Sequence, residues 1–268
     1  MRRKNKPGKK FYIIMGCLIV FFGTFIAWAE SLNNYDINLV DFPAIKEKIK
    51  ESLETITTVP NTDTAVIGGP VGADQTTVLL KVPFTSQAPD GQWEDLRFQD
   101  GCEEASVLMA IKWVKGESIT RTEATAAILD MAEWQLQSYG SFRDTNAQDT
   151  ADRLIRDYFS YNQYRVSKEV NTQNIVAELR AGNIVLVPAN GQKLYNPYFT
   201  APGPEHHMLV IRGYHPSTDE FITNDPGTKR GEGYRYKSEI LIGAVIDYPT
   251  GDHEPITGVQ KAMIIVSK

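Results

Sequence analysis

The sequence predicts an α+β domain in which helices come first and a mainly antiparallel β-sheet follows. Apolar residues recur at helical spacing between residues 102 and 182. Short β-rich runs, separated by Pro, Gly, Asn and Asp, follow between residues 184 and 266. A group of helices followed by a group of strands favours an α+β layout over an alternating one.

The helices are predicted from apolar spacing and from polar residues that can cap a helix. The first begins at Cys102, and its apolar stripe is Ala105, Met109 and Trp113. Three more begin at Thr120 with Glu123 three residues later, at residues 145–148, and at Asn171 or Thr172. The apolar face of the second helix is expected at Ala124, Ile128, Met131 and Leu136.

Five strands are predicted in the second half of the domain, at residues 184–188, 207–214, 220–224, 233–236 and 260–266. Residues 215–219 have the composition of a turn, so the second and third strands should pair as a hairpin. Residues 237–248 fit a helix and a strand equally well. The predicted hairpin would bring the start of strand 207–214 close to the end of strand 220–224.

The first 77 residues precede the domain, which we expect to cover residues 78–268. Residues 1–29 combine a basic run with an apolar segment of about 19 residues, typical of a membrane anchor or a signal peptide. Residues 30–57 resemble an amphipathic helix or stalk, and residues 58–77 a Gly- and Pro-rich linker. The sequence therefore predicts a domain outside the cytoplasm, anchored in the cell membrane or secreted.

Charge and cysteine count exclude several classes of protein. The first ten residues hold six of the 28 Lys and Arg. The rest of the chain holds the other 22 together with all 33 Asp and Glu, so its net charge is −11. Such an acidic body argues against nucleic acid as a partner. Only Cys17 and Cys102 are present, and Cys17 lies in the apolar segment, so a disulfide scaffold is excluded.

Cys102 is the candidate nucleophile. Free N–H groups and the positive dipole at the first turn of a helix favour a thiolate over a thiol. His207 begins a predicted strand and Asp225 follows the next one, an order expected of a Cys-His-Asp hydrolase. A single buried cysteine is more often only a small apolar residue, and it is the combination with His207 and Asp225 that favours catalysis.

Each of these residues has a plausible chemical role. His207 would accept the thiol proton, Asp225 would orient the imidazole ring, and Gln87 would donate its side-chain amide to an oxyanion. No cofactor or metal is expected, because adjacent His206 and His207 point to opposite faces of a strand and no Cys or His pair has ligand spacing.

Four separated motifs resemble the peptidase-C39-like cysteine peptidases, relatives of the leader-cleaving domain of bacteriocin exporters with a papain-like fold. The motifs are V-P-F at residues 82–84 with Gln87, G-C at 101–102, H-M-L-V-I-R-G-Y at 207–214 and N-D-P-G at 224–227. The resemblance covers about residues 78–266. It implies Cys102 as nucleophile, His207 rather than His206 as base, Asp225 as third member and Gln87 as oxyanion-hole donor.

One departure from the family pattern concerns the residues after the cysteine. Many relatives have Gly or Pro there, whereas this chain has Glu103 and Glu104, whose charges would disfavour a neighbouring thiolate. Three hypotheses follow: a hydrolase that cleaves peptides or proteins, an inactive binding module of the same fold, and a transglutaminase-like acyltransferase. The aromatic loop 190–205 is a candidate for the substrate-binding surface.

Overall fold

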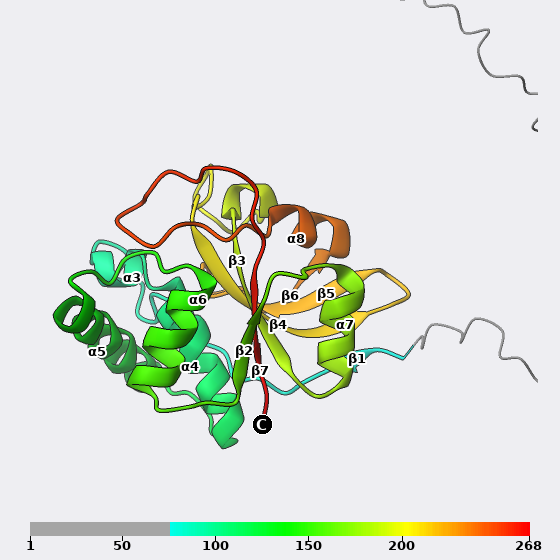
Figure 1. The fold of residues 1–268 in the computed structure, drawn as a ribbon, viewed down its shortest axis with the longest axis horizontal. Helices are drawn as coiled ribbons and strands as arrows, with labels where there is room; N and C mark the ends of the chain where they lie inside the picture. Colours follow the sequence, from blue (N-terminus) through cyan, green and yellow to red (C-terminus); the bar gives the residue numbers. More distant parts are fainter. Residues whose placement is uncertain (1–75) are drawn as a thin grey trace, which may run out of the picture. The chain divides into compact units, whose positions relative to one another are not determined.

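The computed structural model describes residues 76–268 and shows one antiparallel β-sheet with helices on both faces (Figure 1). The helices are α3 (Leu96–Gln99), α4 (Cys102–Lys115), α5 (Arg121–Tyr139), α6 (Ala147–Thr150), the π-helix η1 (Ala151–Tyr158), α7 (Thr172–Arg180), the 3₁₀-helix η2 (Gly191–Leu194) and α8 (Ser238–Ala244). The strands are β1 (Val78–Leu79), β2 (Tyr164–Ser167), β3 (Ile184–Ala189), β4 (His207–His215), β5 (Glu220–Asn224), β6 (Glu232–Lys237) and β7 (Met263–Val266).

The sheet has the strand order β2-β7-β3-β4-β5-β6, and β1 pairs with β4 beyond this path. Each pair of neighbouring strands is antiparallel. The chain thus has the predicted α+β architecture, and β4 and β5 form the predicted hairpin with Val210 opposite Asn224. The hairpin leaves the start of β4 and the residue after β5 at the same end of the sheet.

Alternating residues of the central strands separate two apolar cores. Leu186, Val210 and Ile264 pack under α4 and η1, whereas Val185, Leu209 and Ile265 pack under α7 and α8. In Figure 1, α4, α5 and α6 accordingly lie on one side of the sheet and α7 and α8 on the other. The central strands β3 and β7 are therefore buried on both faces, and continuous apolar runs are the pattern expected for such strands.

Most predicted elements are present, with differences at particular residues. Thr120 caps α5 by accepting a hydrogen bond from the Glu123 N–H, and Asn171 caps α7. Leu136, predicted to be part of the buried face of α5, is 44% exposed, so that prediction was wrong. At this level the buried side chain of α5 is Gln135, which is fully buried and donates to Glu104, so its neighbour Leu136 faces outward.

Four described elements were not predicted: β1, α3, β2 and η2. They are all four residues or fewer, too short for a periodic pattern to develop. The ambiguous stretch 237–248 forms α8 and a single bridge at Val245.

The predicted segments 1–29 and 30–57, and all but the last two residues of the linker, lie outside the described residues. Among residues 76–268, none of the helices has the length and apolarity needed to cross a bilayer.

The pairing of β1 with β4 depends on a glycine. Gly213 lies opposite Leu79, and a Cβ atom there would come within 2.6 Å of the Val78 carbonyl oxygen. We expect Gly213→Ala to lower the free energy of unfolding by about 1–3 kcal/mol, the usual effect of overpacking. Gly243→Ala is the control, since nothing lies within 4 Å of that position on α8 and the change should stabilise by about 0.5–1 kcal/mol. Denaturant unfolding measures both; equal midpoints for Gly213→Ala and the wild type would contradict the packing.

Candidate active site

Cys102 is the first residue of α4 and is almost fully buried, with 4% of its surface exposed. Gly101 precedes it at the N-cap, where a Cβ atom would lie 2.6 Å from the Arg97 carbonyl oxygen of α3. The close approach of α3 therefore requires glycine before the cysteine. The sulfur is held at a helix N-terminus, as predicted from the apolar spacing of residues 102–113.

His207 and Asp225 meet at the open end of the β4–β5 hairpin. His207 Nε2 lies 2.8 Å from Asp225 Oδ1, and both side chains are buried. A carboxylate only accepts hydrogen bonds, so the proton of a neutral ring is on Nε2 and Nδ1 is left as the acceptor. Gly227 makes room for this pair, because a Cβ atom there would lie 2.9 Å from Cε1 of His207.

The Asp225 carboxylate is completely enclosed by donors. Oδ1 also accepts the Gly227 N–H at 3.0 Å, and Oδ2 accepts the Tyr236 hydroxyl at 2.5 Å and the Asn196 amide at 3.4 Å. Burial alone would raise the pKa of Asp225, but His207 and these hydrogen bonds outweigh it and hold the pKa below its usual value. Asp225 is thus an anion fixed behind the imidazole ring.

The thiol and the imidazole line the same pocket, which has a volume of about 430 Å³. Gln87 also lines it, together with Gln99, Asp100, Asp144, Pro204, Glu205, His206 and His253. The structure thus brings Cys102, His207, Asp225 and Gln87 from four segments to one region.

The Cys102 thiol donates its hydrogen bond to the neighbouring Glu103. Cys102 Sγ lies 3.0 Å from Glu103 Oε2, while Glu103 Oε1 accepts the Tyr248 hydroxyl at 2.7 Å and the Thr145 N–H at 3.2 Å. Burial, followed by the charge of Glu103, raises the pKa of Cys102 well above its usual value. Both effects oppose the helix dipole and favour the protonated thiol.

The two glutamates after the cysteine point into the protein. Glu104 accepts a hydrogen bond from the buried Gln135 amide at 2.6 Å, and burial raises its pKa well above the usual value. Both residues are less than 3% exposed. A role for these two residues in selecting basic substrate groups would need an exposed carboxylate, and neither residue offers one.

Gln87 is anchored in a way that the sequence does not reveal. Its amide Nε2 donates to the carbonyl oxygens of Phe98 at 3.1 Å and Gln99 at 2.7 Å, and its backbone N–H donates to Pro226. Both N–H bonds of the amide are therefore used within the protein in this state. Donation to an oxyanion requires one of these bonds to be exchanged.

The aromatic loop 190–205 lies beside the imidazole. The ring of Phe199 packs edge-on against His207 with 5.3 Å between centroids. Phe199, Tyr198 and Trp93 line a second, mainly apolar pocket of about 750 Å³, which shares Gln87 with the first. Sequence reasoning found this loop but missed Asn196 within it and Tyr236 on β6, both of which bind Asp225, because a hydrogen bond between distant segments leaves no local pattern.

The buried Glu103 makes stability depend on pH. Burial and the nearby Asp144 raise the pKa of Glu103 from 4.5 to about 7, so the native state binds its proton more tightly than the unfolded state. This contribution is present at low pH and is lost as pH rises through the window from 4.5 to about 7. We expect the unfolding free energy of the wild type, relative to Glu103→Gln, to fall by about 3 kcal/mol across that window.

Denaturant unfolding at a series of pH values measures this difference. Glu94→Gln serves as the control, since the side chain of Glu94 is exposed to solvent. A difference between wild type and Glu103→Gln that stays constant with pH would contradict the prediction.

This chain is similar to a known protein family and to a solved structure. The model of the Peptidase_C39-like family matches residues 79–245. A solved structure described as a C39-like peptidase from Bacillus anthracis aligns with a TM-score of 0.46 and 16% identity, covering 72% of this chain and 98% of that one. No curated protein matches the chain. Since the family model spans more than half of the sequence and includes Cys102, His207 and Asp225, the chain belongs to the Peptidase_C39-like family.

Proposed function

We propose that this protein is a cysteine peptidase that cleaves peptide bonds through a thioester, with Cys102 as nucleophile, His207 as base and Asp225 as orienting anion. The observation that carries the proposal is the buried His207–Asp225 pair, whose ring lines the same pocket as a thiol at a helix N-terminus. Membership in a peptidase family supports peptides or proteins as substrates.

The reaction begins with release of the thiol from Glu103. The thiol proton passes to Nδ1 of His207, and the sulfur attacks the carbonyl carbon of the substrate. The resulting imidazolium is stabilised by Asp225 and donates its proton to the leaving amine as the C–N bond breaks. A water molecule, deprotonated by the same ring, then hydrolyses the thioester and regenerates the thiol.

The oxyanion formed in both steps needs donors close to the sulfur. The first N–H groups of a helix have no partner within the helix, so the Cys102 N–H is one available donor. The Gln87 amide is the second once it exchanges its bond to Phe98 or Gln99. The substrate carbonyl would compete with those backbone carbonyls for the same N–H.

The two adjoining pockets suit an extended peptide. The larger one offers aromatic surface from Trp93, Tyr198 and Phe199, and the smaller one is lined by acids and histidines. We infer that apolar side chains of the substrate bind on the aromatic side of Gln87 and polar or basic ones on the other.

We also propose that the peptidase domain works outside the cytoplasm. The support is the N-terminal sequence, in which six basic residues precede about 19 uncharged and mostly apolar ones. Such a segment would keep the domain at the cell membrane or direct its secretion. Membrane flotation of the full chain tests the anchor, and N-terminal sequencing of the exported protein tests cleavage.

A second candidate function is an inactive binding module of the same fold. The hydrogen bond from the thiol to Glu103 and the raised pKa of Cys102 favour it, because a protonated and enclosed thiol is a poor nucleophile. This candidate predicts a folded domain whose Cys102 stays unreactive at neutral pH.

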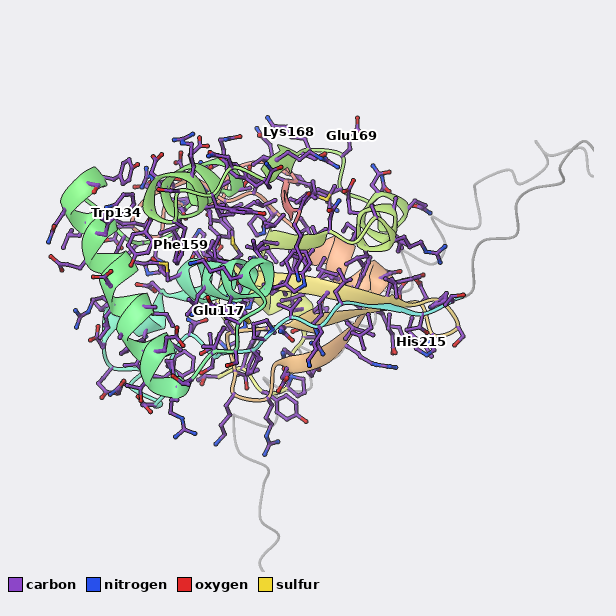
Figure 2. The ribbon with its side chains drawn as sticks, turned by 90° about the horizontal axis from the view of Figure 1, so that it is seen from below. Glu117, Trp134, Phe159, Lys168, Glu169 and His215 are labelled. Carbon is purple, nitrogen blue, oxygen red and sulfur yellow. The ribbon has the colours of Figure 1, made fainter. Side chains whose placement is uncertain are left out.

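Substitution of the sulfur or the base separates these candidates. We expect Cys102→Ala and His207→Ala each to lower peptide cleavage by about 10⁴-fold or more, because the two groups act as a unit. Mass spectrometry of a peptide library detects the cleavage, and added amines reveal acyl transfer in place of hydrolysis. The control is His215→Ala, because His215 and His207 lie at the two ends of β4 and His215 is at the tip of the β4–β5 hairpin. Figure 2 shows His215 at the opposite end of the domain from Trp134. Full activity in Cys102→Ala would refute the proposal.

The orienting role of Asp225 has a separate test. Asp225→Asn removes the charge that stabilises the imidazolium, and we expect it to lower kcat by about 10²–10⁴-fold with little change in KM. Tyr236→Phe keeps the carboxylate and removes one donor, so its loss should be much smaller. Steady-state kinetics on a cleaved library peptide measures both variants. Equal losses in the two variants would assign Asp225 a structural role only.

A further inference from the structure

A second group of polar side chains lies in the pocket of Cys102, apart from the proposed triad. Asp144 comes from the loop before α6, His206 from the residue before β4, and His253 from the loop between α8 and β7. One ligand atom from each lies within 4.8 Å of the others, and all three residues line the pocket. The three residues are far apart in sequence, so the spacing of histidines along the chain gives no sign of this cluster.

The distances within the cluster fit a metal ion. Asp144 Oδ2 lies 3.0 Å from Nδ1 of His253 and 3.7 Å from Nδ1 of His206. In a tetrahedral zinc site with bonds of about 2.0–2.1 Å, neighbouring ligand atoms are about 3.3–3.4 Å apart. The two observed separations lie on either side of this value, so small side-chain rotations would complete the site.

The far nitrogen of each ring faces an acceptor. His206 Nε2 lies 3.1 Å from the Glu254 carbonyl oxygen, and His253 Nε2 lies 3.5 Å from Oδ1 of the buried Asp100. Such partners hold the proton on Nε2 and leave the lone pair on Nδ1, the nitrogen that faces Asp144 in both residues. Two lone pairs directed at a carboxylate repel it unless a positive charge lies between them.

The surroundings supply an excess of negative charge. Asp144 and Asp100 are 3% and 8% exposed, and Glu103 is buried close by. Arg143 is the basic side chain paired with this group, at 3.2 Å from Asp100, and it is shared with Asp252. A divalent cation beside Asp144 would compensate carboxylates that burial otherwise makes costly.

We propose that Asp144, His206 and His253 bind a divalent transition-metal ion, with Zn²⁺ as the best match for two imidazoles and one carboxylate. The fourth position would face the pocket shared with Cys102 and His207, where water or a substrate group can reach it. The proposal rests on residues outside the triad, and it holds whether or not the protein is a peptidase.

Zinc binding to the full chain tests the site directly. Tag-free protein carrying Cys17→Ser and Cys102→Ser, so that no thiol competes, is stripped with a chelator and titrated with Zn²⁺ by calorimetry. We expect one ion per chain. Asp144→Ala, His206→Ala and His253→Ala should each weaken binding by more than about a hundredfold, since even outer partners of metal ligands contribute about 10–100-fold. His215→Ala should bind as tightly as the parent.

A thermal measurement keeps the test decisive if a buried variant fails to fold. The side chain of His253 is 50% exposed, so His253→Ala should fold as the parent does. Zn²⁺ should raise the Tm of the parent and of His215→Ala and leave that of His253→Ala unchanged. Absence of binding to the parent, or equal affinities for the parent and His253→Ala, would overturn the proposal.

Discussion

The packing of α4 on β4 is the constraint on which the site depends. Met109 and Ala110 of the helix share a core with Met208 and Val210 of the strand, and the Ser106 hydroxyl donates to the Met208 carbonyl oxygen at 3.3 Å. These contacts fix the start of the helix opposite the start of the strand. The sulfur and the imidazole therefore meet in one pocket because two apolar surfaces fit, although 104 residues of chain lie between Cys102 and His207.

The electrostatics of the site show two opposing arrangements on either side of the imidazole. Behind His207, Asp225 is buried but surrounded by donors, so its pKa falls and its charge is retained. Beside Cys102, Glu103 is equally buried but shares its surroundings with Asp144, so its pKa rises. Burial raises the pKa in both places, and the neighbouring charge, His207 beside Asp225 and Asp144 beside Glu103, decides the outcome. The anion thus lies next to the imidazole ring, and a carboxyl that titrates near neutrality accepts the hydrogen bond of the thiol.

Much of the fold could be predicted because its elements carry local signals. Capping residues located the starts of α5 and α7, and β5 has the predicted bounds of residues 220–224. The inward direction of Glu103 could not be predicted, because a helix start normally exposes acids to solvent and its donors Tyr248 and Thr145 are distant in sequence. The cluster of Asp144 and His253 could not be predicted either, since both residues lie on irregular loops with positive φ angles.

His206 and His207 are adjacent in sequence but lie in two different chemical environments. Successive side chains at the start of a strand point to opposite sides, so His207 faces Asp225 while His206 faces Asp144. Each ring has Nε2 directed at an oxygen acceptor and Nδ1 left free to act as a base or ligand. Since both rings line the pocket of Cys102, a shift of β4 by one residue would exchange the proposed base for the proposed metal ligand. The bulge between Ile211 and Gly213 and the pairing of β3 with β4 hold that register, so the chemistry of the pocket depends on backbone hydrogen bonds several residues away.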